Sequence, residues 1–157
     1  MQHNTPHKGL LPVKIALVGE TGTGKSWLCA RLQHPDAVAL PEAAPTLGVD
    51  FKLANVDGAR VHIWDTSGDP KYHQISQCYY RQVHGVCICY DSQREQTLDE
   101  VPAWLQRIRE HGTPSAIAIC ATKSDALASE VGASCLHACH ALWLTASLTF
   151  AVPSGYS

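Results

Sequence analysis

The sequence predicts a doubly wound, three-layer α/β domain with a mostly parallel sheet and one antiparallel edge strand. Short apolar runs alternate with helical patterns, and the first run leads directly into a glycine-rich phosphate-binding loop, as in a P-loop NTPase domain. The runs expected to form strands are Lys14–Val18, Val61–Trp64, Gly85–Tyr90, Ala116–Cys120 and Ala141–Leu144. Most of them lack polar alternation, which is typical of parallel strands buried on both faces. Right-handed crossovers would then place a ligand at the carboxyl ends of the strands.

Two local patterns complete this prediction. Apolar residues recur at spacings of three and four over Thr97–His111, which indicates an amphipathic helix that ends at Gly112. The segment Phe51–Asn55 alternates in polarity and faces Val61–Trp64 across Asp57-Gly58, a dipeptide suited to a tight hairpin. This hairpin supplies the antiparallel edge strand.

Composition narrows the possible functions. The 157 residues suffice for one domain, which we expect over residues 13–157 after a flexible lead-in at 1–12. A net charge of -2 argues against nucleic acid as the main partner. The seven cysteines are odd in number and follow no signal peptide, so we expect reduced thiols and a cytoplasmic location. No run reaches the roughly 20 apolar residues of a membrane span, and we expect a monomer without an integral membrane segment.

The strongest motif is the segment from Gly19 to Ser26, which matches the phosphate-binding pattern G-x-x-x-x-G-K-[ST]. Its glycines permit positive φ angles, so that successive N–H groups can converge on phosphate oxygens. Lys25 would reach the β- and γ-phosphates and Ser26 would ligate Mg²⁺, with a helix opening at Trp27. The residues expected to bind the nucleotide here are Gly19, Thr21, Gly22, Thr23, Gly24, Lys25, Ser26 and Trp27. The alternative is a flexible strand-to-helix turn without a ligand.

Two further elements fit the same ligand. Asp65 ends an apolar strand and Gly68 follows three residues later, an arrangement suited to a magnesium carboxylate and a γ-phosphate-sensing N–H. Alone, this could be an ordinary turn after a strand. The tetrapeptide Thr122-Lys123-Ser124-Asp125 follows the strand that ends at Cys120. The carboxylate of Asp125 could accept two N–H bonds from guanine. Adenine presents an acceptor at that edge and would be disfavoured.

With these motifs in this order, the chain resembles the Ras superfamily of small GTPases, most closely its Rab branch. The likeness is specific at Pro45–Lys52, Ile63–Gly68 and Tyr79–Val86. The resemblance implies that Thr46 joins Ser26 and Asp65 as a metal ligand, and that Thr145, Ala146 and Ser147 form the last guanine loop. It also implies catalytic roles for Lys25, Thr46, Gly68 and position 69. Phe51, Trp64 and Tyr79 match the family's aromatic effector surface, although all three could simply be packing residues.

The function implied is a GTP-binding switch that takes GTP or GDP with Mg²⁺ as cofactor and hydrolyses GTP. Effector, exchange and GTPase-activating proteins are the implied partners, in vesicle trafficking or signalling, with peripheral membrane attachment through partners. Asp69 stands where the family usually carries the glutamine that orients the attacking water. A carboxylate is shorter and negatively charged, which is unfavourable beside the γ-phosphate, so we expect slow hydrolysis. A hydrolysis-deficient or nucleotide-free scaffold is the main alternative. A small adenine-nucleotide kinase ranks lower because of the Thr122–Asp125 motif.

The end of the sequence departs further from the family pattern. Only ten residues follow Ser147, so we expect the family's long final helix to be missing, as in a truncated isoform or a divergent paralogue. No cysteine stands near this end to carry a prenyl anchor. A possible Zn²⁺ cluster contains Cys135, His137, Cys139 and His140. The competing interpretation, a helix with cysteines on its buried face, is the favoured one.

Overall fold

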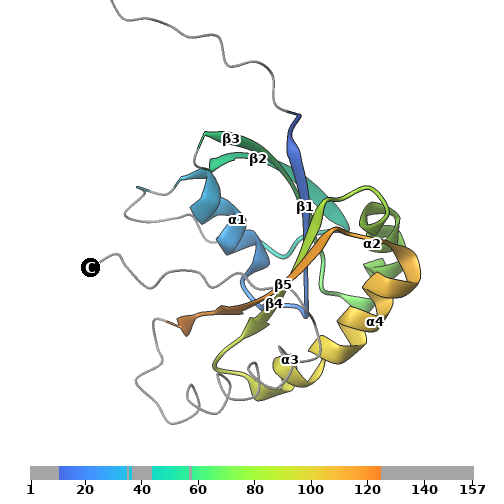
Figure 1. Cartoon of the computed structure of the whole chain (residues 1–157). Coiled ribbons are helices and arrows are strands. Elements are labelled where there is room, and N and C mark those ends of the chain that lie inside the picture. The colour runs from blue at the N-terminus through green and yellow to red at the C-terminus, as the bar shows by residue number, and fades with distance from the viewer. Residues whose placement is uncertain (1–10, 35, 37–43, 57, 125–157) are drawn as a thin grey trace, which may run out of the picture.

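The five described strands form one sheet with the spatial order β2-β3-β1-β4-β5 (Figure 1). The computed structural model describes residues 11–34, 36, 44–56 and 58–124. Its strands are β1 (Val13–Val18), β2 (Val49–Val56), β3 (Ala59–Thr66), β4 (Gly85–Asp91) and β5 (Ala116–Thr122). The predicted strand Ala141–Leu144 lies outside the described residues.

The pairing of the strands confirms the predicted class. β1 pairs in parallel with β3 and β4, and β4 pairs in parallel with β5. β2 is antiparallel to β3 and occupies the edge, with Phe51 opposite Trp64. Parallel neighbours bring the carboxyl ends of β1, β3, β4 and β5 to one edge of the sheet, where the phosphate-loop motif begins.

Helices cover both faces of the sheet and give it three layers (Figure 1). Alternate residues of β1 divide between them, because successive side chains on a strand point to opposite faces. Leu17 joins Cys29 of α1 (Lys25–Gln33) in one core cluster. Ala16 and Val18 join the larger cluster on the other face, which α2 (His73–Tyr80), α3 (Glu95–Asp99) and α4 (Val101–His111) complete.

The prediction of one continuous helix over Thr97–His111 is wrong, because the chain forms two helices there. α3 begins earlier, at Glu95, and Glu100 separates it from α4. Pro102 lies in the first turn of α4. Since proline lacks an N–H and its ring collides with the carbonyl four residues earlier, a continuous helix is interrupted just before it. The predicted end at Gly112 is confirmed, since Gly112 caps α4.

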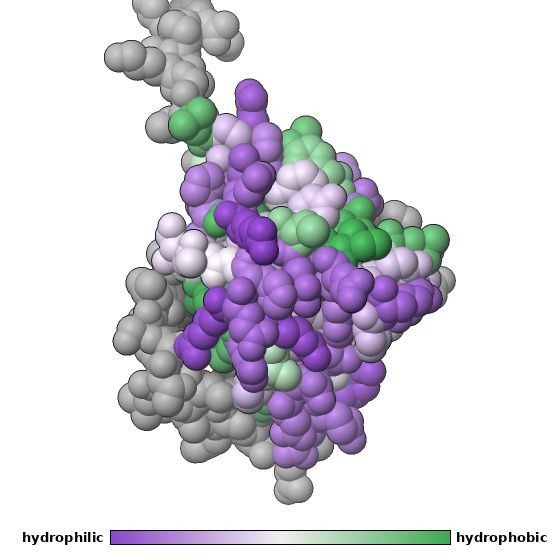
Figure 2. All heavy atoms as spheres, turned by 90° about the vertical axis from the view of Figure 1, so that its right-hand side faces the viewer, coloured by the Kyte–Doolittle hydropathy of each residue, from purple (hydrophilic) through white to green (hydrophobic). Residues whose placement is uncertain are grey.

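Helix α2 and the short 3₁₀ turn η1 (Pro70–Tyr72) before it were not predicted individually from the sequence. Ser76 and Tyr80 are the buried residues of α2 and stand four residues apart, which is the spacing that could have revealed it. The side of the molecule that carries α2 and α4 has a largely hydrophilic surface, interrupted by a smaller hydrophobic area (Figure 2).

The described cysteines are free thiols, in agreement with the predicted reduced state. Cys29 and Cys89 are buried in the core, as expected of small apolar side chains. The cluster around Cys135 and His137 lies outside the described residues. Among the helices that the structure describes, none has the length and apolar character required to span a bilayer.

Candidate nucleotide-binding site

A pocket of about 650 Å³ lies at the carboxyl ends of the strands, where the sequence predicts the ligand. Its walls combine the glycine-rich loop, the start of α1, the segment before β2, the loop after β3 and the residue after β5. The predicted site residues that line it are Thr21, Gly22, Gly24, Lys25, Ser26, Trp27, Thr46, Gly68, Asp69 and Lys123. Gly19, Thr23, Asp65 and Thr122 are predicted residues that are described but do not line it. Asp125, Thr145, Ala146 and Ser147 lie outside the described residues.

The glycine-rich loop has the backbone that the motif requires. Gly19, Gly22 and Gly24 have φ angles of 133°, 75° and 79°, which confirms the predicted positive values. A side chain at Gly19 would also overlap the backbone carbonyl of Cys89, so the loop lies tightly against β4. Residues without a Cβ therefore let this backbone turn between β1 and α1.

Lys25 lies inside this loop, where it is only 5% exposed. Its Nζ donates to the carbonyl oxygens of Gly19 and Glu20, at 2.8 Å each, and lies 3.4 Å from the Thr23 hydroxyl. Burial lowers the pKa of Lys25, and nearby Cys89, Asp65 and Glu20 partly oppose that effect. A poorly hydrated ammonium group beside backbone N–H groups is well suited to an anionic phosphate.

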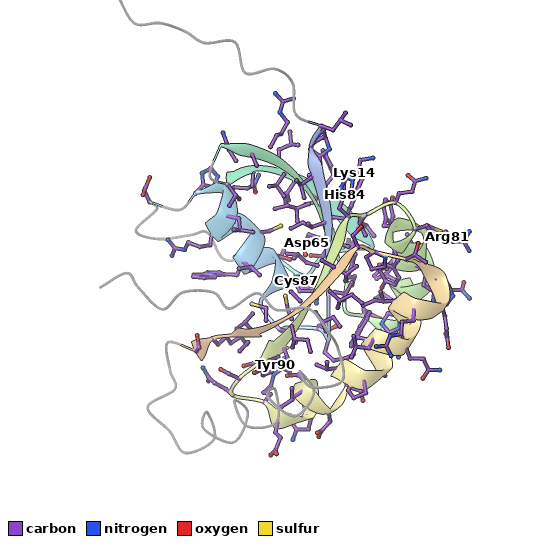
Figure 3. All side chains as sticks on the ribbon, viewed as in Figure 1. Lys14, Asp65, Arg81, His84, Cys87 and Tyr90 are labelled. Atoms are coloured by element: carbon purple, nitrogen blue, oxygen red, sulfur yellow. The ribbon has the colours of Figure 1, made fainter. Side chains whose placement is uncertain are left out.

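A second feature suits a divalent cation. The hydroxyls of Ser26 and Thr46 are 2.8 Å apart, although they belong to residues 20 positions apart in the sequence. Asp65 lies in the interior between the sheet and α1 (Figure 3). Its Oδ1 is buried without a hydrogen-bond partner among the described residues. Burial raises the pKa of Asp65, against the hydrogen bond from Ser26 and the charge of Lys25.

These three oxygen-bearing side chains fit Mg²⁺, which prefers hard oxygen ligands and usually takes only one or two carboxylates from the protein. A buried carboxylate oxygen without a partner costs free energy unless a cation or water satisfies it. The arrangement brings together all three residues that the sequence analysis named as metal ligands.

The loops before β2 and after β3 contact each other and the phosphate loop. The Ser67 N–H donates to the Gly48 carbonyl at 2.7 Å, which joins the two loops beside the pocket. A Cβ at Gly68 would overlap the backbone of Glu20 and Thr21. Position 68 therefore approaches the phosphate loop more closely than any residue with a side chain could.

Asp69 has a structural role that the sequence analysis did not foresee. Its carboxylate accepts a hydrogen bond from the Lys71 N–H at 3.1 Å and caps η1. The same carboxylate lies 2.8 Å from the Lys71 ammonium. The Lys71 side chain lowers the pKa of Asp69, so the carboxylate stays charged at neutral pH.

The segment after β5 is held by hydrogen bonds that were not predicted from the sequence. The Thr122 hydroxyl lies 2.7 Å from the Thr23 carbonyl and 2.8 Å from the Tyr90 carbonyl, so Thr122 links β5 to the phosphate loop. Lys123 has a positive φ of 57°, and its Nζ lies 2.7 Å from Oδ2 of Asp91. The same oxygen accepts a bond from Arg94 Nε at 2.9 Å, and Arg94 Nη2 donates to the Thr21 carbonyl at 3.0 Å.

Asp91 thus connects the segment after β5 with the phosphate loop. Asp91 lies at the carboxyl end of β4, between β1 and β5, whose carboxyl ends also carry predicted site residues. This position is the sequence signal that could have identified Asp91 as part of the site.

The three aromatic residues of the predicted effector surface form one cluster. The rings of Phe51 and Trp64 have centroids 4.7 Å apart, and Trp64 and Tyr79 are also 4.7 Å apart. Phe51 is 42% exposed, so the cluster reaches the surface. The cluster joins β2, β3 and α2, and it therefore spans the segments on either side of the loop that contains Gly68.

The fold, the glycine loop and the Asp65 carboxylate near the end of β3 define a P-loop domain of the Ras type. The family model described as "Ras of Complex, Roc, domain of DAPkinase" matches residues 14–125. The chain therefore belongs to the Ras superfamily of small GTPases, and within it the chain is Rab-like.

Three relatives place it there. The chain is 35% identical to Ras-related protein Rab11C of Lotus japonicus over 80% of the present chain. It is 34% identical to Ras-related protein Rab-8B of Dictyostelium discoideum over 66%, and 36% identical to Ras-related protein Rab-26 of Bos taurus over 62%. The matched parts span 59%, 52% and 40% of those relatives' own lengths.

Proposed function

We propose that this chain is a GTP-binding molecular switch that binds GTP and GDP in the pocket of about 650 Å³ and hydrolyses GTP slowly. The observation that carries the proposal is the buried Lys25 ammonium inside a loop of positive-φ glycines, together with Oδ1 of Asp65, which has no hydrogen-bond partner among the described residues. An anionic polyphosphate with a divalent cation satisfies both charges at once.

In the proposed complex, Lys25 and the backbone N–H groups of the loop orient the phosphates, and the Gly68 N–H contacts the γ-phosphate. Ser26, Thr46 and Asp65 would hold Mg²⁺, whose charge would neutralise the β- and γ-phosphate oxygens. Thr46 and Gly68 belong to the loops before β2 and after β3, so contacts to the γ-phosphate would order both loops. Asp125, Ala146 and their neighbours are the proposed guanine-binding residues.

Competition between nucleotides tests this function directly. Purified protein in Mg²⁺ is titrated with fluorescent GDP, which is then displaced separately with GTP and with ATP. We expect displacement by GTP and none by ATP, because a carboxylate that accepts two guanine N–H bonds rejects the adenine edge. Equal displacement by ATP would contradict guanine specificity, and absence of binding would favour the nucleotide-free scaffold.

The hydrolysis-deficient switch is a second candidate, favoured by the ion pair between Asp69 and Lys71. A charged carboxylate at position 69 adds negative charge beside the γ-phosphate and cannot donate a hydrogen bond to it.

We expect Asp69→Gln to increase single-turnover GTP hydrolysis by about tenfold or more, since a neutral amide can orient water beside the phosphate. Phosphate release from a preformed GTP complex measures this rate. Asp99→Asn, at an exposed residue of α3, is the matched control and should leave the rate unchanged. If Asp69→Gln hydrolyses GTP no faster than the wild type, the charge at position 69 does not explain slow turnover.

Partners are part of the same proposal. We expect effector proteins to contact the aromatic cluster of Phe51, Trp64 and Tyr79, and exchange and GTPase-activating proteins to act on the two loops beside the pocket. Aromatic side chains that combine exposure with close packing are suited to such a contact, since they bury much area at little entropic cost. Rab-like relatives favour a role in vesicle trafficking.

A further inference from the structure

The phosphate loop is tied to α4 by a hydrogen bond that no nucleotide motif contains. Oε1 of Glu20 accepts the Nε1–H of Trp104 at 3.1 Å, across 84 positions of sequence. Trp104 is only 1% exposed and belongs to the larger core cluster. A buried indole N–H needs an acceptor, and Glu20 supplies it.

Glu20 also takes part in the geometry of the phosphate-binding lysine. Its backbone carbonyl accepts a bond from Lys25 Nζ at 2.8 Å and another from the Thr23 hydroxyl, also at 2.8 Å. Glu20 therefore orients Lys25 through its backbone carbonyl, while its side chain is bonded to Trp104 in the core of the domain. A shift of the Glu20 peptide would displace the ammonium group and the adjacent N–H groups together.

The indole of Trp104 is itself held from two further directions. The ring of His73, the first residue of α2, meets it edge-on with centroids 4.9 Å apart and an interplanar angle of 74°. The guanidinium carbon of Arg107 lies 4.8 Å from the indole centroid. These contacts fix the orientation of the ring, so the direction of its N–H is determined before a ligand arrives.

We propose that Glu20 and Trp104 are a positioning pair, in which the indole N–H holds the phosphate loop in its nucleotide-binding conformation and thereby slows nucleotide release. This inference rests on the proposed GTP and GDP binding. Neither side chain need touch the nucleotide, because the pair acts through the Glu20 peptide and Lys25. Loss of the bond would leave the loop to sample conformations in which its N–H groups diverge, and dissociation would become faster.

A double-mutant cycle on the dissociation of fluorescent GDP tests the pair. Trp104→Phe keeps an aromatic ring in the core but removes the donor, and Glu20→Ala removes the acceptor from a partly exposed loop. We expect each to raise the dissociation rate by about tenfold, which is the size of effect for a lost hydrogen bond to a charged group. The double variant should dissociate no faster than either single one, since both remove the same bond.

Two further variants distinguish positioning from general packing. Glu20→Gln keeps an oxygen that can accept the indole N–H and should restore the slow wild-type rate. Arg109→Met removes a cation from an exposed position of the same helix and should also leave the rate unchanged. Thermal unfolding of each variant without nucleotide reports changes in the fold, and Glu20→Ala tests the proposal even if Trp104→Phe folds poorly.

Outcomes that overturn the inference are distinct from those that overturn the function. If the wild type binds GDP and either single variant dissociates at the wild-type rate, or the effects of the two variants simply multiply, Glu20 and Trp104 are not a positioning pair. A fast-dissociating Glu20→Gln variant would also overturn it. If the wild type binds no GDP, both the proposed function and this inference are wrong.

Discussion

Replacing Lys25 with methionine is expected to weaken GDP and GTP binding by about a hundredfold or more. The ammonium group would contribute at least two charge-assisted hydrogen bonds to phosphate oxygens, each worth about 1.5–3 kcal/mol. Methionine retains much of the apolar stem in a position that is 5% exposed, so the substitution removes the charge without opening a large cavity. Titration with fluorescent GDP in Mg²⁺ measures the loss of affinity.

Stability should respond much less than affinity. Since burial lowers the pKa of Lys25, the folded protein holds the charged form at a cost, and removing the charge relieves it. The lost bonds to the Gly19 and Glu20 carbonyls offset this gain, so we expect the free energy of unfolding without nucleotide to change by about 1 kcal/mol or less. Lys52→Met is the control, because Lys52 lies on edge strand β2 and pairs with Asp50 at the surface. If Lys25→Met kept wild-type affinity, the phosphate would not lie at this loop.

Asp91→Asn is expected to lower the free energy of unfolding by about 2–3 kcal/mol at neutral pH, and to weaken nucleotide binding. The Asp91 side chain is 2% exposed and its Oδ2 lies 2.7 Å from Lys123 Nζ and 2.9 Å from Arg94 Nε. Asparagine keeps the shape and can still accept the Gln93 N–H, so the variant isolates the negative charge. The estimate stays below that of a fully buried pair because both cations are about half exposed and can be hydrated when released.

The pH dependence of this effect has a definite sign. Burial acts to raise the pKa of Asp91, but the bonds from Lys123, the Gln93 N–H and Arg94 outweigh it and the pKa is lowered overall. A carboxyl group whose pKa is lower in the folded state stabilises the protein above its unfolded pKa of about 3.9, and that contribution is lost as the pH falls through the folded value.

Urea unfolding of wild type and Asp91→Asn should therefore show a constant difference above about pH 5 that shrinks under more acidic conditions. Asp99→Asn, at an exposed position, serves as the control. Its free energy of unfolding should stay close to that of the wild type at each pH. A difference between wild type and Asp91→Asn that is independent of pH down to the acid transition would show that the charge of Asp91 is not what stabilises the domain.

The class of fold and the position of the phosphate loop can both be predicted from the sequence. Strand periodicity, the glycines from Gly19 to Gly24 and the order of the motifs act over a few residues, so each can be recognised locally. The described strands, their mostly parallel pairing and the antiparallel edge at β2 follow from those patterns. Where two local preferences competed, as with the apolar spacing of Thr97–His111 and the proline at 102, the helix divided at Glu100.

Which distant side chains support the site depends on how the strands and helices pack together. Asp91 and Lys123 are 32 positions apart, and Glu20 and Trp104 are 84 apart, so no periodic pattern relates them. Many polar residues could have filled such roles, and the choice depends on which strand ends and helix faces come together. Local conformational preferences are short-ranged and therefore readable in order along the chain, whereas hydrogen bonds between elements exist only after sheet order and helix packing have brought their partners within about 3 Å.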